Sequence, residues 1–545
     1  MAAGPAETFD GIVIGAGHNG LVLQAYLCRA GLRVLALERS LEAGGGLCTV
    51  EDNRCPGFYH NIHAVFLRGL AALPWYRDLA LEARGVRAVQ PALNLALLPG
   101  DGPPLRWYTD EGRTCAALAE LSPADAAAWR RIASEYAPVV QEIVEPALAA
   151  PPLPPERERA LLERSAAGRA YLAVEPLSPR DFVEKHFEHP LVRAALLYLC
   201  VIREVDVNAP GQGALVPALI AGRVKAQLAL GGSAAVARGL VADVHAHGGA
   251  VWEGAAVRRI VVERGRAAAV ELADRRRVGA RAFIASSLNP QQTLLDLLGG
   301  EGLDAATRER ARAYRYQTVG PLFGLHLALE EPPRYAGAAA GGPGDDVDRA
   351  FLTLLGLRGP EEVYALYADH AAGRPAAVPV IWGTVPTTHD PGQAPPGKHT
   401  AFVWQKVPYA LHGDAANWDA AKEGHAAAVL SRWREFAPNL TDRAILNRFA
   451  LSPLDTERRF PNMAGGDLGV GWMGPGQRGA DRPLPGQRPY RTPAPGLYLC
   501  GACTHPGGNI TGLPGYNAAR AIAEDLGIRP WWDPPDLAER WSRLS

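Results

Sequence analysis

The chain has 545 residues, which is too long for one ordinary hydrophobic core and predicts roughly two to four domains. Basic and acidic residues number 56 and 57, so the net charge of −1 argues against a nucleic-acid partner. Hydrophobic residues make up 48% of the chain and charged residues 21%, the composition of a folded globular protein and not of a disordered one.

Cysteine usage and hydropathy predict a reduced, cytoplasmic protein. The seven cysteines are odd in number and scattered, and Cys500 and Cys503 form a CxxC pair without a second pair, so no metal site is expected. The N-terminus lacks a charged segment followed by an apolar core, so we expect no export signal. The best apolar run, residues 194–202, is half of the roughly 18 residues that span a bilayer, which leaves peripheral membrane contact open.

In chain order, the first elements predict a dinucleotide site. Residues 12–14 are a β-branched run that stops at Gly15, the composition of a buried parallel strand. Gly15, Gly17 and Gly20 have the GxGxxG spacing. The first glycine permits a tight turn, the second lets a pyrophosphate approach the backbone, and the third lets the next helix pack on the strand. That helix is predicted over residues 19–30, with its first N–H groups toward the phosphates.

The residues after this helix indicate which dinucleotide is bound. A second strand over residues 33–37 delivers Glu38, whose carboxylate is placed to accept hydrogen bonds from a ribose. Glycines at 44–46 follow at once, where flavoprotein oxidases and desaturases place a second glycine pair along the FAD diphosphate. We therefore expect FAD and not NAD as the cofactor.

The middle of the chain begins with a mostly helical region, residues 72–221. The proline-rich stretch 149–155 divides it, and a nearly continuous apolar helix over 190–202 meets the charged sequence Arg203-Glu204-Val205-Asp206. We interpret these charges as a solvated helix end, with a substrate clamp as the alternative.

Strands follow this helical region. Four short strands are predicted to return the chain to the nucleotide-binding sheet: residues 251–253, 257–262, 267–272 and 282–285. Val257, at the start of the second of these, would contact the adenine end of the cofactor through its backbone. Three further strands are expected to form one face of a substrate pocket: residues 319–329, 378–382 and 400–404.

The C-terminal motif is another strand, glycine loop and helix. The strand over residues 495–502 leads into the loop Thr-His-Pro-Gly-Gly-Asn-Ile-Thr-Gly, and the helix after it stops at Gly527. Backbone N–H groups of Ile510 and Thr511 would point at the N1–C2=O edge of a flavin, where negative charge accumulates on reduction. This placement favours acceptance of a hydride by the ring.

Four stretches together resemble the bacterial phytoene desaturase family of FAD-dependent oxidoreductases, with retinol saturase as a wider relative. They are GAGHNGL at 15–21, the glycines after Glu38, DPGQAPPGKH at 390–399, and GLYLCGACTHPGG at 496–508 with NAA at 517–519. The resemblance implies a flavin amine oxidase-like α/β fold, in which a Rossmann-type FAD-binding domain carries an inserted mixed α+β substrate domain. It implies FAD segments at 1–72, 222–300 and 488–530, a helical substrate part at 73–221, a mixed-sheet part at 301–487, and a tail at 531–545.

The chain departs from the family pattern at two places near the flavin. Asn509 stands where relatives commonly have a third glycine, and residues 467–471 are Asp-Leu-Gly-Val-Gly in place of a Phe-His-Gly element. Flavin amine oxidases place an aromatic residue at the point equivalent to Asn509, to hold the substrate amine against the ring. An amine substrate is therefore disfavoured.

The leading functional hypothesis is dehydrogenation of a C–C bond or an adjacent C–OH bond in a largely apolar small molecule, with hydride transfer to flavin N5. Oxygen or quinone would reoxidise the flavin, and the oligomeric state stays open. Three alternatives remain: a flavin amine oxidase, a redox-neutral double-bond isomerase, and a non-enzymatic scaffold. His505, Asn509 and His63 are expected beside the ring, with His505 as the better base; the alternatives are a buttress of the flavin loop for His505 and a loop histidine for His63. The expected cofactor-binding residues are Gly15, Gly17, His18, Asn19, Gly20, Glu38, Arg39, Gly45, Gly46, Val257, Gly501, Ala502, Ile510 and Thr511.

Overall fold

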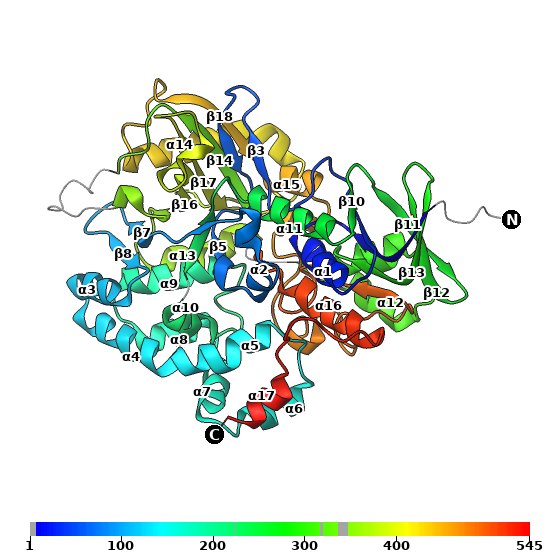
Figure 1. Ribbon diagram of the computed structural model, residues 1–545. Coiled ribbons are helices and arrows are strands. Elements are labelled where there is room, and N and C mark those ends of the chain that lie inside the picture. Colours follow the sequence, from blue (N-terminus) through cyan, green and yellow to red (C-terminus); the bar gives the residue numbers. More distant parts are fainter. Residues whose placement is uncertain (1–6, 224, 317–319, 336–346, 545) are drawn as a thin grey trace.

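A computed structural model describes residues 7–223, 225–316, 320–335 and 347–544 of the chain (Figure 1). The described part contains two seven-stranded sheets: one combines strands from both ends of the chain with residues 250–286, and the other takes its strands from the segments between. Residue 319 of the predicted strand 319–329 and parts of the predicted terminal segments, residues 1–6 and 545, lie outside the described residues.

The first sheet is the predicted nucleotide-binding sheet. Its strands run in the order β10 (Ala250–Trp252), β2 (Val34–Leu37), β1 (Glu7–Ile14), β13 (Arg277–Ser286), β12 (Arg266–Leu272) and β11 (Val257–Glu263), and β19 (Leu497–Leu499) pairs with β13. The pairs among β10, β2, β1, β13 and β19 are parallel, whereas β11, β12 and β13 form an antiparallel meander. Strands from three distant parts of the chain therefore share one sheet, which confirms the Rossmann-type α/β fold class.

Helices from both ends of the chain pack together beside this sheet. They are α1 (His18–Arg29), α11 (Ala234–Ala246) and α16 (Leu513–Asp525) (Figure 1). A Cβ at Gly515 would stand 1.9 Å from the carbonyl oxygen of Asn19, so the backbones of α16 and α1 meet directly. The start of α16 is thereby held against the start of α1.

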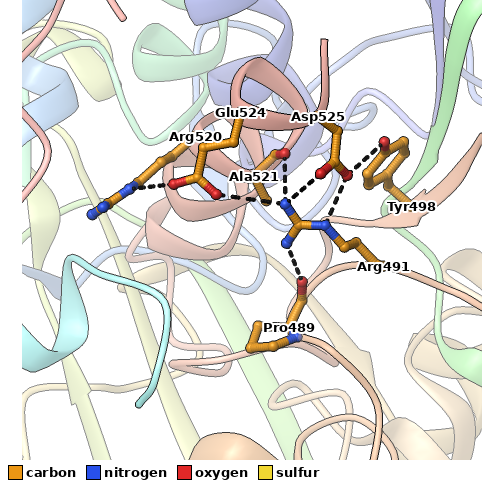
Figure 2. Close-up of polar contacts among 7 residues, drawn as sticks. All are labelled: Pro489, Arg491, Tyr498, Arg520, Ala521, Glu524 and Asp525. Atoms are coloured by element: carbon orange, nitrogen blue, oxygen red, sulfur yellow. Dashed lines mark hydrogen bonds and ion pairs between the residues drawn. The ribbon is translucent and has the colours of Figure 1, made fainter. Parts of the chain in front are cut away.

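Arg491 fastens the C-terminal segment internally (Figure 2). Its guanidinium forms two bonds of 2.7 and 2.9 Å to the Asp525 carboxylate and donates to the Ala521 carbonyl of α16 at 3.0 Å. The Tyr498 hydroxyl of β19 donates to the same carboxylate at 2.9 Å. One ion pair therefore ties the loop before β19, the strand itself and the end of α16 together.

The second sheet forms the centre of the middle region. Its order is β18 (Ile445–Leu451), β14 (Leu322–Leu329), β17 (His399–Lys406), β16 (Ile381–Thr384), β15 (Leu352–Leu355), β7 (Leu93–Leu98) and β8 (Leu105–Tyr108). The predicted strand 400–404 lies inside β17, while the strand predicted at 378–382 begins only at Ile381 and runs to Thr384. Pro379 explains the delay, since proline has no N–H for a ladder.

Helices cover this sheet. The predicted helical region comprises α3 (Glu111–Leu121), α4 (Pro123–Val139), α5 (Glu145–Leu148), α6 (Pro155–Leu162), α7 (Ala166–Val174), α8 (Pro179–His186), α9 (Pro190–Ile202) and α10 (Leu215–Ala221). The apolar helix α9 packs its Ala195 and Leu197 into one core with Phe351 and Trp382 of the sheet region. α14 (Asn417–Phe436) contributes Trp418 and Trp433 to a separate core on β14.

The remaining strands and helices are mostly short. They are the strands β3 (Thr49–Glu51), β4 (Tyr59–Asn61), β5 (Leu67–Arg68), β6 (Ala88–Val89) and β9 (Ala226–Ala229), and the helices α2 (Pro74–Asp78), α12 (Ala305–Arg312), α13 (Pro360–Ala371), α15 (Pro453–Arg459) and α17 (Leu537–Ser542). β5 pairs with β9 where the chain crosses between the two sheets, so a residue on β5 lies near both regions.

Candidate active site

The N-terminal and C-terminal motifs line one large cavity of about 490 Å³. Twelve of the predicted cofactor and catalytic residues are in its wall: Gly15, Gly17, His18, Asn19, Glu38, Arg39, Gly45, Gly46, Val257, Ala502, Asn509 and Ile510. Gly20, Gly501, Thr511, His63 and His505 are not in that wall. The large cavity therefore joins two loops that lie almost five hundred residues apart in sequence.

The glycines of the first loop have the steric roles that the sequence predicts. A Cβ at Gly20 would stand 2.3 Å from the Gly15 carbonyl oxygen and 3.1 Å from a methyl of Val13, so only glycine lets α1 pack this closely on β1. Gly15 has a φ of +87°, as its tight turn requires. Gly17 faces Gly45 across the cavity wall, where a Cβ on Gly45 would lie 3.1 Å from the Gly17 Cα. The two glycine segments thus form one narrow backbone cradle.

Glu38 stands at the far end of this cradle, at the end of β2. Its carboxylate accepts hydrogen bonds from the backbone N–H groups of Ala16 at 3.0 Å and Ser40 at 2.9 Å. These bonds fix the side chain against the glycine turn and leave lone pairs for a ligand. The geometry fits the predicted ribose contact.

Two polar atoms beside the first helix turn have no protein partner. His18 Nε2 and Asn19 Oδ1 are buried and form no hydrogen bond within the described part of the chain. Burial lowers the pKa of His18 to about 4, so its imidazole is neutral at pH 7. Because buried polar groups are normally paired, these atoms fit a cavity that receives a polar ligand. Cradle, carboxylate and orphan atoms together fit a bound dinucleotide.

The C-terminal loop reaches the other end of the large cavity in a strained conformation. Asn509 and Ile510 have φ values of +72° and +55°, a region that a β-branched residue rarely adopts. Such strain persists only where the surroundings hold it, and it is common at functional sites. Thr511 instead accepts a hydrogen bond from Trp75 Nε1 on its carbonyl oxygen at 2.6 Å, and a Cβ at Gly501 would lie 2.0 Å from the Ser287 carbonyl oxygen. Thr511 and Gly501 therefore support the loop but do not line the large cavity.

A second cavity of about 80 Å³ adjoins the large one at this end. The two cavities share the wall residues Gly46, Met463, Leu468, Asn509 and Ile510. The rest of the second cavity's wall is mainly apolar and aromatic: His63, Ala64, Val65, Phe66, Arg68, Ile202, Glu204, Leu322, Trp382 and Trp404. The Trp382 and Trp404 rings pack edge to face with centroids 4.8 Å apart.

The two predicted histidines differ in placement. His63 lines the second cavity, its Nε2 has no partner among the described residues, and burial together with the Arg459 charge lowers its pKa to about 3. His505 Nε2 contacts the carbonyl oxygen of Ala147 in α5 at 2.8 Å, and His505 is in the wall of neither cavity. The prediction of His505 as the better base is therefore corrected: its imidazole is used by a structural contact that anchors the loop, as in the alternative interpretation.

The favoured interpretation of residues 203–206 as a solvated helix end is wrong. Glu204 is 5% exposed and faces the second cavity, and its carboxylate receives a 2.5 Å bond from the buried Lys406 Nζ of β17. Burial raises the pKa of Glu204, and Lys406 opposes that shift. The apolar helix α9 packs into the core beside the sheet, so the charged residues that directly follow it are held next to that core. Glu204 therefore lies inside the fold beside a cavity, and the alternative of a substrate clamp stays a prediction.

Sequence reasoning missed several further wall residues. The large cavity is also lined by the end of α15 and the residues after it, Arg459, Phe460, Pro461, Asn462 and Met463, and by Ser287, Leu288, Gln292 and Asp296. None of these stretches carries a glycine motif or a periodic pattern. The Asn462 Oδ1 atom accepts a hydrogen bond from the Asn289 N–H at 2.6 Å, which joins two of the missed stretches. Only the tertiary structure places them.

Comparisons with known proteins agree with this architecture. A model described as an NAD(P)-binding Rossmann-like domain matches residues 13–79. One of the subunits of the limonene dehydrogenase of Castellaniella defragrans is 32% identical over 97% of this chain and 96% of its own. The lycopene-forming phytoene desaturase of a Paracoccus species is 27% identical over 94% of this chain and 96% of its own. Cyclohexylamine oxidase from Brevibacterium oxydans shares the fold over 95% of this chain and 99% of its own, with a TM-score of 0.55 and 16% identity.

The fold and the two-ended cavity define an α/β protein with a Rossmann-type nucleotide-binding sheet and the fold of the flavin amine oxidases. With the full-length similarity to a limonene dehydrogenase polypeptide, the chain belongs to the phytoene desaturase-like family of FAD-dependent oxidoreductases. The predicted family and enzyme class are confirmed. Within the described ranges, every helix is too short or too polar to cross a bilayer.

Proposed function

We propose that the protein is an FAD-dependent dehydrogenase that oxidises a C–C bond or an adjacent C–OH bond of a largely apolar molecule. The observation that carries this proposal is the small aromatic cavity that opens onto the Asn509 end of the large one. A substrate there is enclosed by Phe66, Trp382 and Trp404 and is shielded from water. The two relatives named above are, by their names, part of a limonene dehydrogenase and a phytoene desaturase, which supports an apolar substrate.

The large cavity would hold FAD, with Glu38 at the ribose, the Gly17 and Gly45 cradle at the diphosphate, and Ile510 at the ring. When bound, FAD supplies a hydride acceptor at N5. The strained Asn509–Ile510 turn orients backbone groups toward that end, and the aromatic wall positions the carbon that is oxidised. Oxygen or a quinone would serve as the electron acceptor.

His63 is the proposed proton acceptor. Its imidazole is neutral at pH 7 because burial lowers its pKa to about 3, and the unpartnered Nε2 belongs to the wall that the substrate touches. The same burial that depresses the pKa makes a protonated imidazole costly, so onward transfer of the proton to water would follow.

The wall composition also bears on the amine oxidase alternative. Arg68 lies in the second cavity and Arg203 lines the space beyond it, and both are cations. A protonated amine would be repelled by them, and Asn509 supplies no aromatic face on the flavin side.

The test measures anaerobic reduction of the bound flavin as the loss of its visible absorbance. The compounds added are limonene, a linear polyene, 1-decanol and decylamine, each in a separate experiment. Reduction by a hydrocarbon or the alcohol supports the proposal. Reduction by decylamine alone favours an amine oxidase. Conversion of a polyene to an isomer under anaerobic conditions, with the flavin left oxidised at the end, favours the isomerase.

A further inference from the structure

The second cavity is the first of a chain of cavities that leads away from the cofactor site. A third cavity of about 110 Å³ shares the wall residues Phe66, Arg68 and Ile202 with it. A fourth, of about 210 Å³, shares Trp107, Gly222 and Lys225 with the third and includes the exposed Glu111 and Arg223. The third cavity lies between α9, α10 and β5, and the fourth continues from the end of α10 toward α3 and α4. Together they give a substrate room beyond the reacting end.

Two guanidinium groups line the junction. Arg68 of β5 lies in the walls of the second and third cavities, and Arg203 at the end of α9 lies in the wall of the third. Neither side chain forms a hydrogen bond or an ion pair with any residue that the structure describes, although both are only partly exposed. Their free surface faces the cavities.

Other cationic side chains inside the fold differ from Arg68 and Arg203, because they have hydrogen-bond partners. The two terminal nitrogens of Arg482 donate to four carbonyl oxygens at 2.8 to 3.3 Å. Lys225 donates to the carbonyl oxygens of Leu219, Ile220 and Gly222 at the end of α10, and Lys406 pairs with Glu204. The fold therefore supplies partners where a buried cation is structural, and it leaves Arg68 and Arg203 without them.

The surroundings keep both guanidinium groups short of negative charge. Burial and then the charge of Arg203 lower the pKa of Arg68, and burial lowers the pKa of Arg203 to about 10. Glu204 is the carboxylate whose charge reaches Arg68, but it is already paired with Lys406. The charge of Glu111 interacts with Lys225, which lies farther from the cofactor site in the third and fourth cavities. Unpaired buried charge is unfavourable, so an anion between the two arginines would relieve it.

Resting on the function proposed above, we propose that Arg68 and Arg203 bind an anionic oxygen group, a carboxylate or a phosphate, at the end of the substrate remote from the oxidised bond. The substrate is then an amphiphile. Its apolar part lies against Phe66, Trp382 and Trp404, and its acidic group lies at the junction of the second and third cavities. The bond to be oxidised reaches the Asn509 end of the large cavity. Guanidinium groups suit both anions because their paired N–H groups can donate to two oxygens of a planar carboxylate or of a tetrahedral phosphate.

Calorimetric binding to the purified flavoprotein tests the proposal with three probes of one chain length: decanoate, decyl phosphate and methyl decanoate. We expect at least one anion to bind about tenfold or more tightly than the ester, as charge-assisted hydrogen bonds predict. The anion that binds more tightly identifies a carboxylate or a phosphate as the natural group. Arg203→Met and Arg68→Met should each remove most of that preference and leave ester binding within about twofold, because the ester makes no charged contact.

Arg157→Met is the matched control, since Arg157 is exposed on α6 and should keep the full preference. Equal affinity of the wild-type protein for ester and anions overturns the proposal, and so does an anion preference that survives in both cavity variants. The wild-type comparison alone decides the matter if a variant fails to fold. Failure of the proposed function shows itself separately, as protein that lacks flavin or whose flavin no apolar substrate reduces.

Discussion

The large cavity and the second cavity are built in different ways. The large cavity depends on backbone: glycine turns after β1 and β2, the Asn509–Ile510 turn, and a carboxylate fixed by two N–H groups. The second cavity depends on side chains that come from β5, α9, β14, β16 and β17. A backbone site holds one cofactor because its shape is fixed by local sterics, whereas a side-chain site can change its ligand by substitution. Substitutions in the second cavity are therefore expected to change which molecule fits there without altering the backbone of the large cavity.

The largest effect is expected in the second cavity, from removal of its buried charge pair. Lys406→Met leaves the Glu204 carboxylate buried without its 2.5 Å partner, which should lower the free energy of unfolding by about 3–5 kcal/mol. Urea denaturation of the flavoprotein measures it. The double variant Lys406→Met/Glu204→Gln should recover part of the loss.

Arg159→Met is the control for that experiment, because its exposed pair with Glu163 is expected to contribute less than about 1 kcal/mol. A loss in Lys406→Met no larger than in Arg159→Met would mean that another cation satisfies Glu204. Arg68 is the nearest candidate, and the anion site would then be in doubt as well.

Substitutions of His63 and His505 are expected to differ in their effect on activity. His63→Gln should reduce turnover by about 10²-fold with flavin retained, the usual loss for a general base. His505→Ala should keep its flavin and its turnover, because its imidazole is bonded to the Ala147 carbonyl oxygen and lies outside both cavity walls. Stopped-flow reduction with the best substrate of the panel measures both.

The pH dependence sharpens the assignment. Since the pKa of His63 is lowered to about 3, the base stays neutral as the pH falls, and kcat/KM should show no limb near the ordinary histidine value of about 6.5. Full activity of His63→Gln, or loss of activity in His505→Ala with flavin still bound, would reverse the two roles.

In the large cavity, Gly20→Ala should release flavin. The added Cβ would stand 2.3 Å from the Gly15 carbonyl oxygen, so α1 must move away from β1 at a cost of about 1–3 kcal/mol. Flavin content per chain and the unfolding free energy are measured together. Gly424→Ala is the control: it lies in α14 with no heavy atom within 4 Å of the new Cβ and should gain up to about 1 kcal/mol. Normal flavin content in Gly20→Ala would show that helix packing does not set cofactor binding.

The smallest expected effect is the change in stability per pH unit, which depends on the buried histidines His60 and His326. Burial lowers the pKa of His60 to about 4 and that of His326 further below its ordinary value. Above about pH 6.5 both states are neutral and stability is complete; as the pH falls toward 4 the unfolded chain alone takes up protons, which lowers stability by about 1.4 kcal/mol per pH unit for each histidine. Thermal unfolding of the flavoprotein between about pH 7.5 and 5.5 measures the slope.

His326→Phe should flatten that slope, because the ring stacks on Phe449 with centroids 4.9 Å apart and forms no hydrogen bond within the described residues. An unchanged slope would place the acid sensitivity in other groups.

The sequence by itself determined the cofactor end of the site. Gly15, Gly17, Gly20, Glu38 and the 44–46 glycines could be interpreted from spacing, because each answers a steric demand made by residues close to it in the chain. The C-terminal turn was found for the same reason, although Thr511 and Gly501 proved to lie behind the wall. The domain boundaries inferred from the family stay a prediction.

Only the tertiary structure decided the substrate end. Arg203 and Glu204 resemble a solvated helix end in the sequence because their burial depends on β17 and β5, which are remote along the chain. His505 stands in a flavin motif, yet its side chain turns to Ala147, and the motif cannot specify that direction. Backbone conformation follows from local sterics and leaves a pattern in the sequence, whereas the contents of a cavity follow from how distant elements pack.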